Sequence, residues 1–175
     1  MQRVMIVGGP GSGKSTLARI LGEKTGLPIY HMDHIHWKPY WVERTAAEKE
    51  PLVAAVHARD TWIFEGGHSR TYPERLARAD TLIWLDIGIT LRLWRIIRRN
   101  LWDLGHTRPD MTENCPERLG SESLKFWRWT WDTRHYQRAK HLAIVNDPTV
   151  HLTVHHLTSL CAVRGYICSL ERQST

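Results

Sequence analysis

The stretch Gly8-Gly9-Pro10-Gly11-Ser12-Gly13-Lys14-Ser15 decides the fold of this chain. It follows a short apolar run at residues 4–7 and precedes an apolar run with helical spacing at residues 17–21. In such a strand, turn and helix, the glycines let successive backbone N–H groups point into one concavity, and the helix dipole adds positive potential there. The pattern G-x-x-x-x-G-K-[ST] in this context predicts a cradle for the phosphates of a nucleoside triphosphate.

The residues of this stretch have different expected roles in holding the nucleotide. Lys14 can reach the β- and γ-phosphates, and the Ser15 hydroxyl can ligate Mg²⁺. The expected cofactors are therefore ATP and Mg²⁺. The expected nucleotide cradle consists of Gly8, Gly9, Pro10, Gly11, Ser12, Gly13, Lys14, Ser15 and Thr16.

The composition is that of one ordinary globular domain, and we expect a single domain over residues 1–175. Hydrophobic residues make up 42% and charged residues 24% of the chain, and no apolar run approaches the length of a membrane span. The chain enters a strand at once, which predicts that there is no signal peptide. Three cysteines without a C-x-x-C pair favour reduced thiols and a cytoplasmic protein, either a monomer or a homodimer.

The net charge is +6, and most of the surplus lies in one part of the chain. Between residues 92 and 140 there are eleven lysines and arginines against six acidic residues, a surplus of five. Such a stretch attracts polyanions. ATP with an acidic or phosphorylated substrate fits this charge, and so does nucleic acid, so charge alone does not choose between them.

Alternating strands and helices after the glycine-rich turn predict an α/β fold with a five-stranded parallel sheet between two layers of helices. A short helical lid is expected as an insertion at about residues 104–119. A capping box at residues 45–48 starts one helix, in which Pro51 should kink the first turns or mark a later start. The expected strands are residues 4–7, 29–31, 61–64, 81–86 and 151–154, and the expected helices are 14–25, 45–59, 90–104, 121–140 and 159–170.

An acidic residue follows each of three expected strands. The carboxyl ends of parallel strands meet at one edge of a sheet, so Asp33 and Glu65 should lie beside the glycine-rich turn. Asp33 could hold Mg²⁺ through water or accept a proton from a hydroxyl, although both residues could also be simple caps. Asp86 closes an apolar strand in the manner of a Walker B carboxylate. The candidate metal ligands are Ser15, Asp33, Glu65 and Asp86.

Aromatic and histidine residues follow Asp33 in the segment His31-Met32-Asp33-His34-Ile35-His36-Trp37. Trp37 either walls a substrate pocket or fills apolar space. The three histidines lack the helical spacing or cysteine partners of a closed metal site, which favours solvated or substrate-facing side chains.

Arginines gather in the expected helix 90–104 and in the polar segment after it. Arg95 and Arg99 are separated by one helical turn, and their mutual repulsion is relieved if an anion sits between them. The segment 105–118 contains two prolines together with Arg108 and Arg118, which is typical of a mobile flap.

These motifs together resemble the adenylate kinase-like P-loop kinases, and most closely the subfamily usually labelled DNA topology modulation protein. The matching stretches run over nearly the whole chain and are weakest after about residue 145. They are residues 8–16, 31–37, 62–69, 85–86, 105–111 and 115–118.

The resemblance implies a role for each matching residue. Asp33 and the pair Glu65-Gly66 occupy the positions that approach Mg²⁺ and the acceptor, with Glu65 standing where the family has Asp. Arg70 resembles the arginine that anchors a phosphate or carboxylate of the acceptor. Arg95 resembles one that packs over the ATP base, and the lid arginines that grip phosphates correspond to Arg99, Arg108 and Arg118.

Other features of this family are missing from the sequence, so adenylate kinase activity itself is not predicted. The lid is short and has one cysteine, so the zinc-bearing lid of some adenylate kinases is absent, and helices that bind a nucleoside monophosphate are not recognisable. The sequence therefore predicts an ATP-dependent phosphotransferase acting on a small-molecule or nucleotide acceptor. Lys14, Asp33, Arg99, Arg108 and Arg118 are its candidate catalytic residues, and Asp33, Trp37, Glu65, Gly66 and Arg70 its candidate acceptor-binding residues.

The alternative function is a nucleic-acid-associated ATPase or regulator of DNA topology. The basic stretch 92–140 fits it, and exposed tryptophans could stack on bases. No helix-turn-helix, RNA-recognition or zinc-finger pattern supports it, so it is not favoured. A GTPase is disfavoured because no N-K-x-D motif follows the fourth strand.

Overall fold

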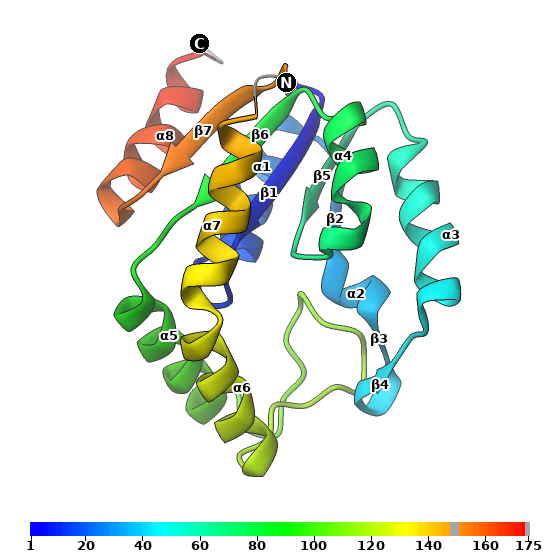
Figure 1. Cartoon of the computed structure of the whole chain (residues 1–175), viewed down its shortest axis with the longest axis vertical. Helices are drawn as coiled ribbons and strands as arrows, with labels where there is room; N and C mark the ends of the chain where they lie inside the picture. The colour runs from blue at the N-terminus through cyan, green and yellow to red at the C-terminus, as the bar shows by residue number, and fades with distance from the viewer. Residues whose placement is uncertain (148–150, 174–175) are drawn as a thin grey trace.

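The computed structural model describes residues 1–147 and 151–173 and shows one parallel sheet with helices on both faces (Figure 1). The five strands lie in the order β2-β5-β1-β6-β7, so that β1, which leads into the glycine-rich turn, is central. All four strand pairs are parallel, which brings the carboxyl ends to one edge. The strands are β1 (Arg3–Gly8), β2 (Ile29–His31), β5 (Trp62–Glu65), β6 (Thr81–Leu85) and β7 (Thr153–Leu157).

The helices lie on both sides of the sheet and below its carboxyl edge (Figure 1). They are α1 (Lys14–Thr25), α2 (Met32–His36), α3 (Ala46–His57), α4 (Tyr72–Arg78), α5 (Ile89–Trp102), α6 (Ser121–Asp132), α7 (Arg134–Val145) and α8 (Leu160–Gln173). Two 3-10 helices, η1 (Pro39–Trp41) and η2 (Ser69–Thr71), and a hairpin of β3 (Trp37–Lys38) with β4 (Val42–Glu43) complete the described elements. Within the described ranges no helix has the length and apolarity needed to cross a bilayer.

Alternate residues of the central strand enter different cores because successive side chains of a strand point to opposite faces. Val4 and Ile6 of β1 pack with α1 and α8, in a cluster that includes Leu17 and Tyr166. Met5 and Val7 pack on the other face, in a cluster with side chains of α3, α4 and α7. The three-layer α/β/α fold and the five-stranded parallel sheet are therefore confirmed.

Most predicted elements are present, most of their boundaries differ by one to three residues, and one predicted helix is divided in two. The last strand spans Thr153–Leu157, two to three residues later than predicted. The predicted helix 121–140 is divided into α6 and α7 at Thr133, whose hydroxyl donates to the Trp129 carbonyl and so caps the end of α6. Helix α3 begins directly after the capping box of Thr45 and continues through Pro51 without a later start.

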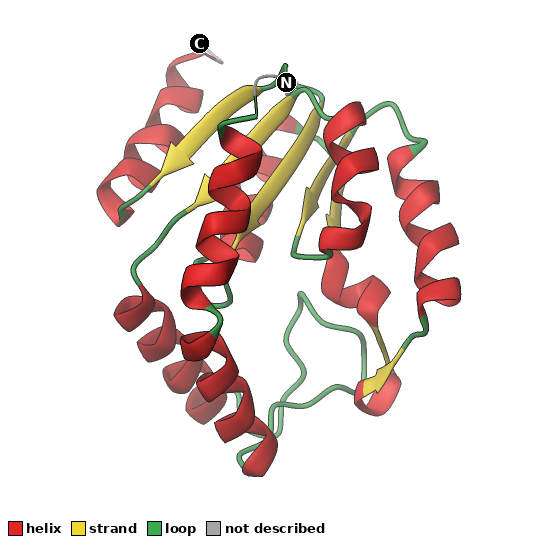
Figure 2. Ribbon diagram, viewed as in Figure 1, coloured by secondary structure: helices red, strands yellow, loops and turns green. Residues whose placement is uncertain are grey.

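The predicted helical lid is wrong in its secondary structure. Residues 103–120 contain turns and loops but no helix, and Figure 2 shows this segment as a green loop below the carboxyl edge of the sheet. Backbone bonds between Gly105 and Glu117 and between Glu117 and His106 close its base. Two prolines and the polar run remove the pattern that a helix needs, so tertiary contacts shape the segment instead.

This loop, residues 103–120, is fastened to the hairpin on the far side of the sheet edge. Tyr40 donates its backbone N–H to the Asn114 carbonyl at 2.9 Å. The Trp41 indole N–H donates to the Pro116 carbonyl at 2.9 Å. Segments about 75 residues apart in sequence thus meet below the carboxyl ends of the strands (Figure 1).

Candidate active site

The glycine-rich turn has room for a ligand only because its glycines lack side chains. Gly8, Gly11 and Gly13 have φ values of 147°, 74° and 98°, which L side chains rarely adopt. A Cβ at Gly8 would lie 2.7 Å from the Leu85 carbonyl oxygen. The turn therefore keeps its backbone N–H groups at the start of α1 free of side-chain cover, as a site for triphosphate requires.

Two arginines of α5 donate hydrogen bonds to backbone carbonyls of this turn. The Arg92 Nε donates to the Pro10 carbonyl at 2.9 Å, and a Cβ at Gly9 would lie 1.9 Å from the Arg92 guanidinium. The Arg95 guanidinium donates to the Ser12 carbonyl at 3.3 Å. Arg95 thus contacts the cradle itself, and Arg92 is a site residue that the sequence prediction missed. Its signal in the sequence was its helical spacing with Arg95 and Arg99, which puts the three arginines on one face.

Glu65 lies at the centre of the site and is only 3% exposed. Its Oε1 accepts a hydrogen bond from the Ser15 hydroxyl at 2.9 Å and lies 2.7 Å from His31 Nδ1. Burial alone would raise the pKa of Glu65, but the hydrogen bond with His31, the charge of Lys14 and the Ser15 hydroxyl lower it below its ordinary value. The carboxylate is therefore held ionised beside the phosphate cradle.

Asp33 and Lys14 are the other charged groups at the cradle, and both are half-buried. Burial and the negative charge of Glu65 raise the pKa of Asp33, which makes it a better proton acceptor than an ordinary aspartate. Burial lowers the pKa of Lys14, although Glu65 and Asp33 oppose that shift. The Lys14 ammonium donates to the Gly9 carbonyl at 3.3 Å, so it folds back over the turn.

Two of the three predicted lid arginines meet at Glu117, Arg108 from the loop 103–120 and Arg99 from α5. Arg108 lies 3.0 Å from Asp110 and 2.7 Å from Glu117, and the Arg99 Nε lies 3.6 Å from Glu117. Burial opposes ionisation of Asp110, but Arg108 and the Ser15 hydroxyl lower its pKa, so the loop reaches the cradle. Arg118 is exposed and its side chain makes no hydrogen bond or ion pair in the described residues, so it is not part of this group.

Two predicted site residues lie elsewhere. The Asp86 carboxylate lies 3.0 Å from both the Arg138 guanidinium and His156 Nε2, so its oxygens face α7 and β7 rather than Ser15. These partners come from α7 and from β7, the strand that pairs with the outer side of β6. Arg70 is exposed and lies 3.6 Å from Glu50 of α3, away from the carboxylates at the cradle. In the described residues, neither Asp86 nor Arg70 makes a hydrogen bond to the Ser15 hydroxyl, which donates to Glu65.

The remaining predicted residues lie near the expected edge. Gly66 is buried with φ of 110°, and a Cβ there would lie 2.6 Å from the Met32 Cβ. Trp37 is half-buried and packs edge-on against the Trp41 ring, with centroids 5.4 Å apart. Thr16 is exposed on the first turn of α1.

Magnesium would be held here by few protein groups. Within the described residues no three His, Cys, Asp or Glu side chains form a ready cation cluster. Mg²⁺ usually binds through one or two carboxylates, substrate phosphates and water, so a complete protein cage is not required. The Ser15 hydroxyl together with the Glu65 and Asp33 carboxylates is a suitable oxygen set of this kind.

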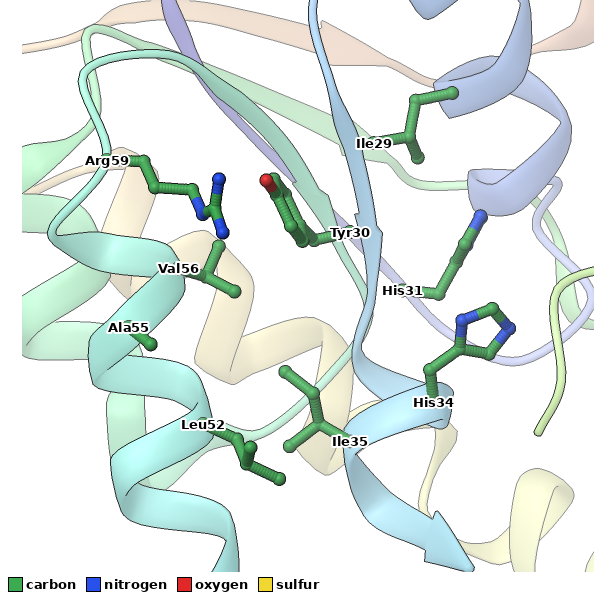
Figure 3. A pocket seen from close by; sticks show the side chains of 9 residues that line it. All are labelled: Ile29, Tyr30, His31, His34, Ile35, Leu52, Ala55, Val56 and Arg59. Carbon is green, nitrogen blue, oxygen red and sulfur yellow. The ribbon is translucent and has the colours of Figure 1, made fainter.

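A pocket of about 270 Å³ lies beside the edge strand β2 and shares His31 with the cradle. Figure 3 shows Tyr30 and Arg59 on one side of the strand and His31 and His34 on the other. The pocket lies along this strand rather than at the glycine-rich turn, and it includes His31, which contacts Glu65.

We compared the chain with known proteins by sequence and by structure. No protein-family model and no curated protein matches the chain. A gluconokinase structure from Sinorhizobium meliloti 1021 is 16% identical with a TM-score of 0.52, covering 98% of this chain and 93% of that one. A shikimate kinase from Acinetobacter baumannii, in complex with shikimate, is 17% identical with a TM-score of 0.56, covering 99% and 93%.

A sugar kinase from Janibacter sp. HTCC2649 is a third similar structure, 14% identical with a TM-score of 0.50, covering 99% of this chain and 92% of that one. At these identities the likeness concerns the fold. This chain has the α/β fold of these kinase structures.

Proposed function

We propose that this protein is an ATP- and Mg²⁺-dependent kinase that transfers the γ-phosphoryl group to a hydroxyl of a small molecule or nucleotide. The observation that carries the proposal is the contact of Glu65 with the P-loop Ser15 hydroxyl, beside Lys14 and Asp33. The nucleotide cradle, the Lys14 ammonium and the Asp33 carboxylate as proton acceptor thus lie at one edge of the sheet. The similar structures named gluconokinase, shikimate kinase and sugar kinase support a small-molecule acceptor.

The residues of the site divide the work of phosphoryl transfer among them. Lys14 and the backbone N–H groups bind the phosphates, and bound Mg²⁺ would neutralise further charge on the phosphate oxygens. Asp33, with its raised pKa, accepts the proton of the acceptor hydroxyl or orients that hydroxyl. Arg99 and Arg108 lie near the cradle, where guanidinium groups stabilise charge spreading over the transferred group.

The charges of Lys49 and Asp33 both act on His36, and Lys49 offers a cation for an acceptor with an anionic group. Lys49 is buried, with its ammonium 2.8 Å from the exposed Glu43 carboxylate and 3.4 Å from His36 Nδ1. His68 Nδ1 is buried and has no partner in the described residues. Burial and the charge of Lys49 lower the pKa of both His36 and His68, a sign that cationic groups crowd this side.

Finer assignments belong to the same proposal. An adenylate kinase-like enzyme of the topology modulation subfamily, acting in the cytoplasm, remains our proposal from the sequence motifs. The rival, a nucleic-acid-associated ATPase, is favoured by exposed Trp94 and Trp102, whose rings flank the Arg98 guanidinium at 5.2 and 5.1 Å. DNA binding with a steep salt dependence would support the rival. Acceptor-dependent ADP release without DNA would support the kinase.

The first test is ADP release across a panel that pairs neutral with anionic acceptors: nucleosides with their monophosphates, and sugars with hydroxy acids. Lys14→Ala should lower acceptor-dependent turnover by at least about 100-fold, because a cation at the transferring phosphates is lost. Arg19→Ala is the control, since Arg19 is exposed on the same helix. Lys14→Ala with wild-type turnover would contradict the proposed role.

A further inference from the structure

Arg75 of α4 is a cation that is 0% exposed and has no carboxylate within ion-pair distance in the described part of the chain. Its Nη1 donates to the Gly66 carbonyl at 3.0 Å, and its Nη2 lies 3.4 Å from the Thr71 hydroxyl and 3.9 Å from the Met32 sulfur. The guanidinium stacks on the Phe64 ring at 3.8 Å. All of these groups are neutral.

Burial of the Arg75 guanidinium among neutral groups lowers the stability of the folded state. An ionised side chain that leaves water is poorly compensated by neutral acceptors, and the Arg75 Nε has no partner at all in the described residues. Burial lowers the pKa of Arg75 to about 10, so the side chain still carries its charge at neutral pH. An apolar side chain of similar length would fill the same space without this cost.

The contacts of Arg75 lie next to both carboxylates of the site. Met32 directly precedes Asp33, and Gly66 directly follows Glu65. These two backbone segments are already in close contact, because a Cβ at Gly66 would lie 2.6 Å from the Met32 Cβ. The guanidinium lies behind this junction, and the positive charge of Arg75 also interacts with the negative charge of Glu65.

We propose that Arg75 is a positioning residue: it holds the segments that carry Asp33 and Glu65 against each other at the phosphate cradle and touches neither reactant. This inference rests on the proposed kinase function for its effect on turnover, but the holding of the two segments can be measured without it. The planar guanidinium suits the role because its N–H groups reach carbonyl, hydroxyl and sulfur at once.

The test compares Arg75→Met, which keeps the length of the side chain but removes its charge and donors, with Arg75→Lys, which keeps a charge. Arg78→Met is the control, because Arg78 is exposed on the same helix.

Hydrogen exchange of residues 32–36 and 66–69 should be faster in Arg75→Met than in the wild type, while exchange at residues 9–13 and affinity for ADP stay unchanged. Turnover should fall about 10- to 100-fold with little change in the acceptor KM, since small displacements of catalytic groups have effects of this size. The exchange rates and the turnover of Arg75→Lys should lie between those of the wild type and those of Arg75→Met.

Unchanged exchange and turnover in both variants would overturn the inference, as would a turnover loss that matches the unfolded fraction measured in urea. If Arg75→Met does not fold, Arg75→Lys provides the same comparison with the charge retained. If the wild type releases no ADP with any acceptor, the kinase proposal fails. The exchange of the two segments then still decides whether Arg75 holds them.

Discussion

Glu65 shows at the level of a single residue how neighbours set the chemistry of a side chain. Its carboxylate is buried, yet His31 and Ser15 both contact Oε1. Burial lowers the pKa of His31, but the hydrogen bond with Glu65 and the charge of Glu65 raise it above the ordinary 6.5. The glutamate is thus held in place by a histidine from the adjacent strand.

This pair makes stability depend on pH through His31. Its contribution is fully present below the ordinary pKa of 6.5 and is lost as pH rises through the higher folded-state pKa. Glu65 stays ionised over this window, because its folded-state pKa lies below 4.5. His31→Gln should therefore lower the free energy of unfolding by about 1.5–3 kcal/mol near pH 5.5 and by less near pH 8.5.

Urea unfolding at the two pH values checks this prediction. His135→Gln is the control, since His135 is exposed on α7. An equal loss of stability at both pH values would mean that His31 and Glu65 do not titrate as a pair.

At the scale of elements, the phosphate cradle is shaped jointly by β1, α1 and α5. Arg92 of α5 lies where a side chain at Gly9 would be, and its Nε donates to Pro10. A Cβ at Gly11 would lie 2.4 Å from the Arg92 carbonyl oxygen. The glycines of the turn therefore serve helix packing as well as ligand binding.

Gly9→Ala should weaken ADP binding about tenfold or more, a change of about 1.4 kcal/mol, because its Cβ displaces the Arg92 guanidinium that supports the cradle. The matched control is Gly165→Ala in α8, where a Cβ meets no atom within 4 Å. This control should leave ADP binding unchanged and stabilise the protein by about 0.5–1 kcal/mol, as alanine does within a helix. Calorimetric titration and urea unfolding measure both effects, and wild-type affinity in Gly9→Ala would contradict the packing argument.

At the scale of the whole molecule, the loop 103–120 connects the two sides of the site. Glu117 is buried and lies 2.7 Å from the Arg108 Nε and 3.6 Å from the Arg99 Nε, and the Asn100 amide donates to it. Burial and the charge of Arg108 lower the pKa of Arg99. Two arginines are thus kept together near the cradle by one carboxylate.

Glu117→Gln should destabilise the protein by about 3–5 kcal/mol, because it removes the anion beside Arg99 and one of the two anions beside Arg108. A phosphate-bearing ligand near these groups would supply negative charge, so ADP with Mg²⁺ should raise the Tm of Glu117→Gln more than that of the wild type. Thermal unfolding with and without the nucleotide checks this, with exposed Glu122→Gln as the control. If ADP raises the Tm of the variant and of the wild type equally, Arg99 and Arg108 do not interact with the bound nucleotide.

Predictions from the sequence were most accurate where one local pattern decides the outcome. Lys14 and Ser15 belong to a contiguous motif. Glu65 ends β5 and Asp33 closely follows β2, two strands whose carboxyl ends must meet in a parallel sheet. Asp86 also ends a strand, but its partners Arg138 and His156 lie 52 and 70 residues away. Arg75 was missed because the short helix α4 between two strands has little pattern of its own.

The sequence by itself determined the α/β fold, the glycine-rich cradle and the two carboxylates beside it, because periodicity and strand ends are properties of short stretches. Only the tertiary structure decided which cations serve that site. It placed Arg92 behind the turn, Arg75 behind the carboxylates, and Arg70 at the surface beside α3. The physical reason is that the burial and partners of a long charged side chain depend on elements far away in the chain, which local pattern does not encode.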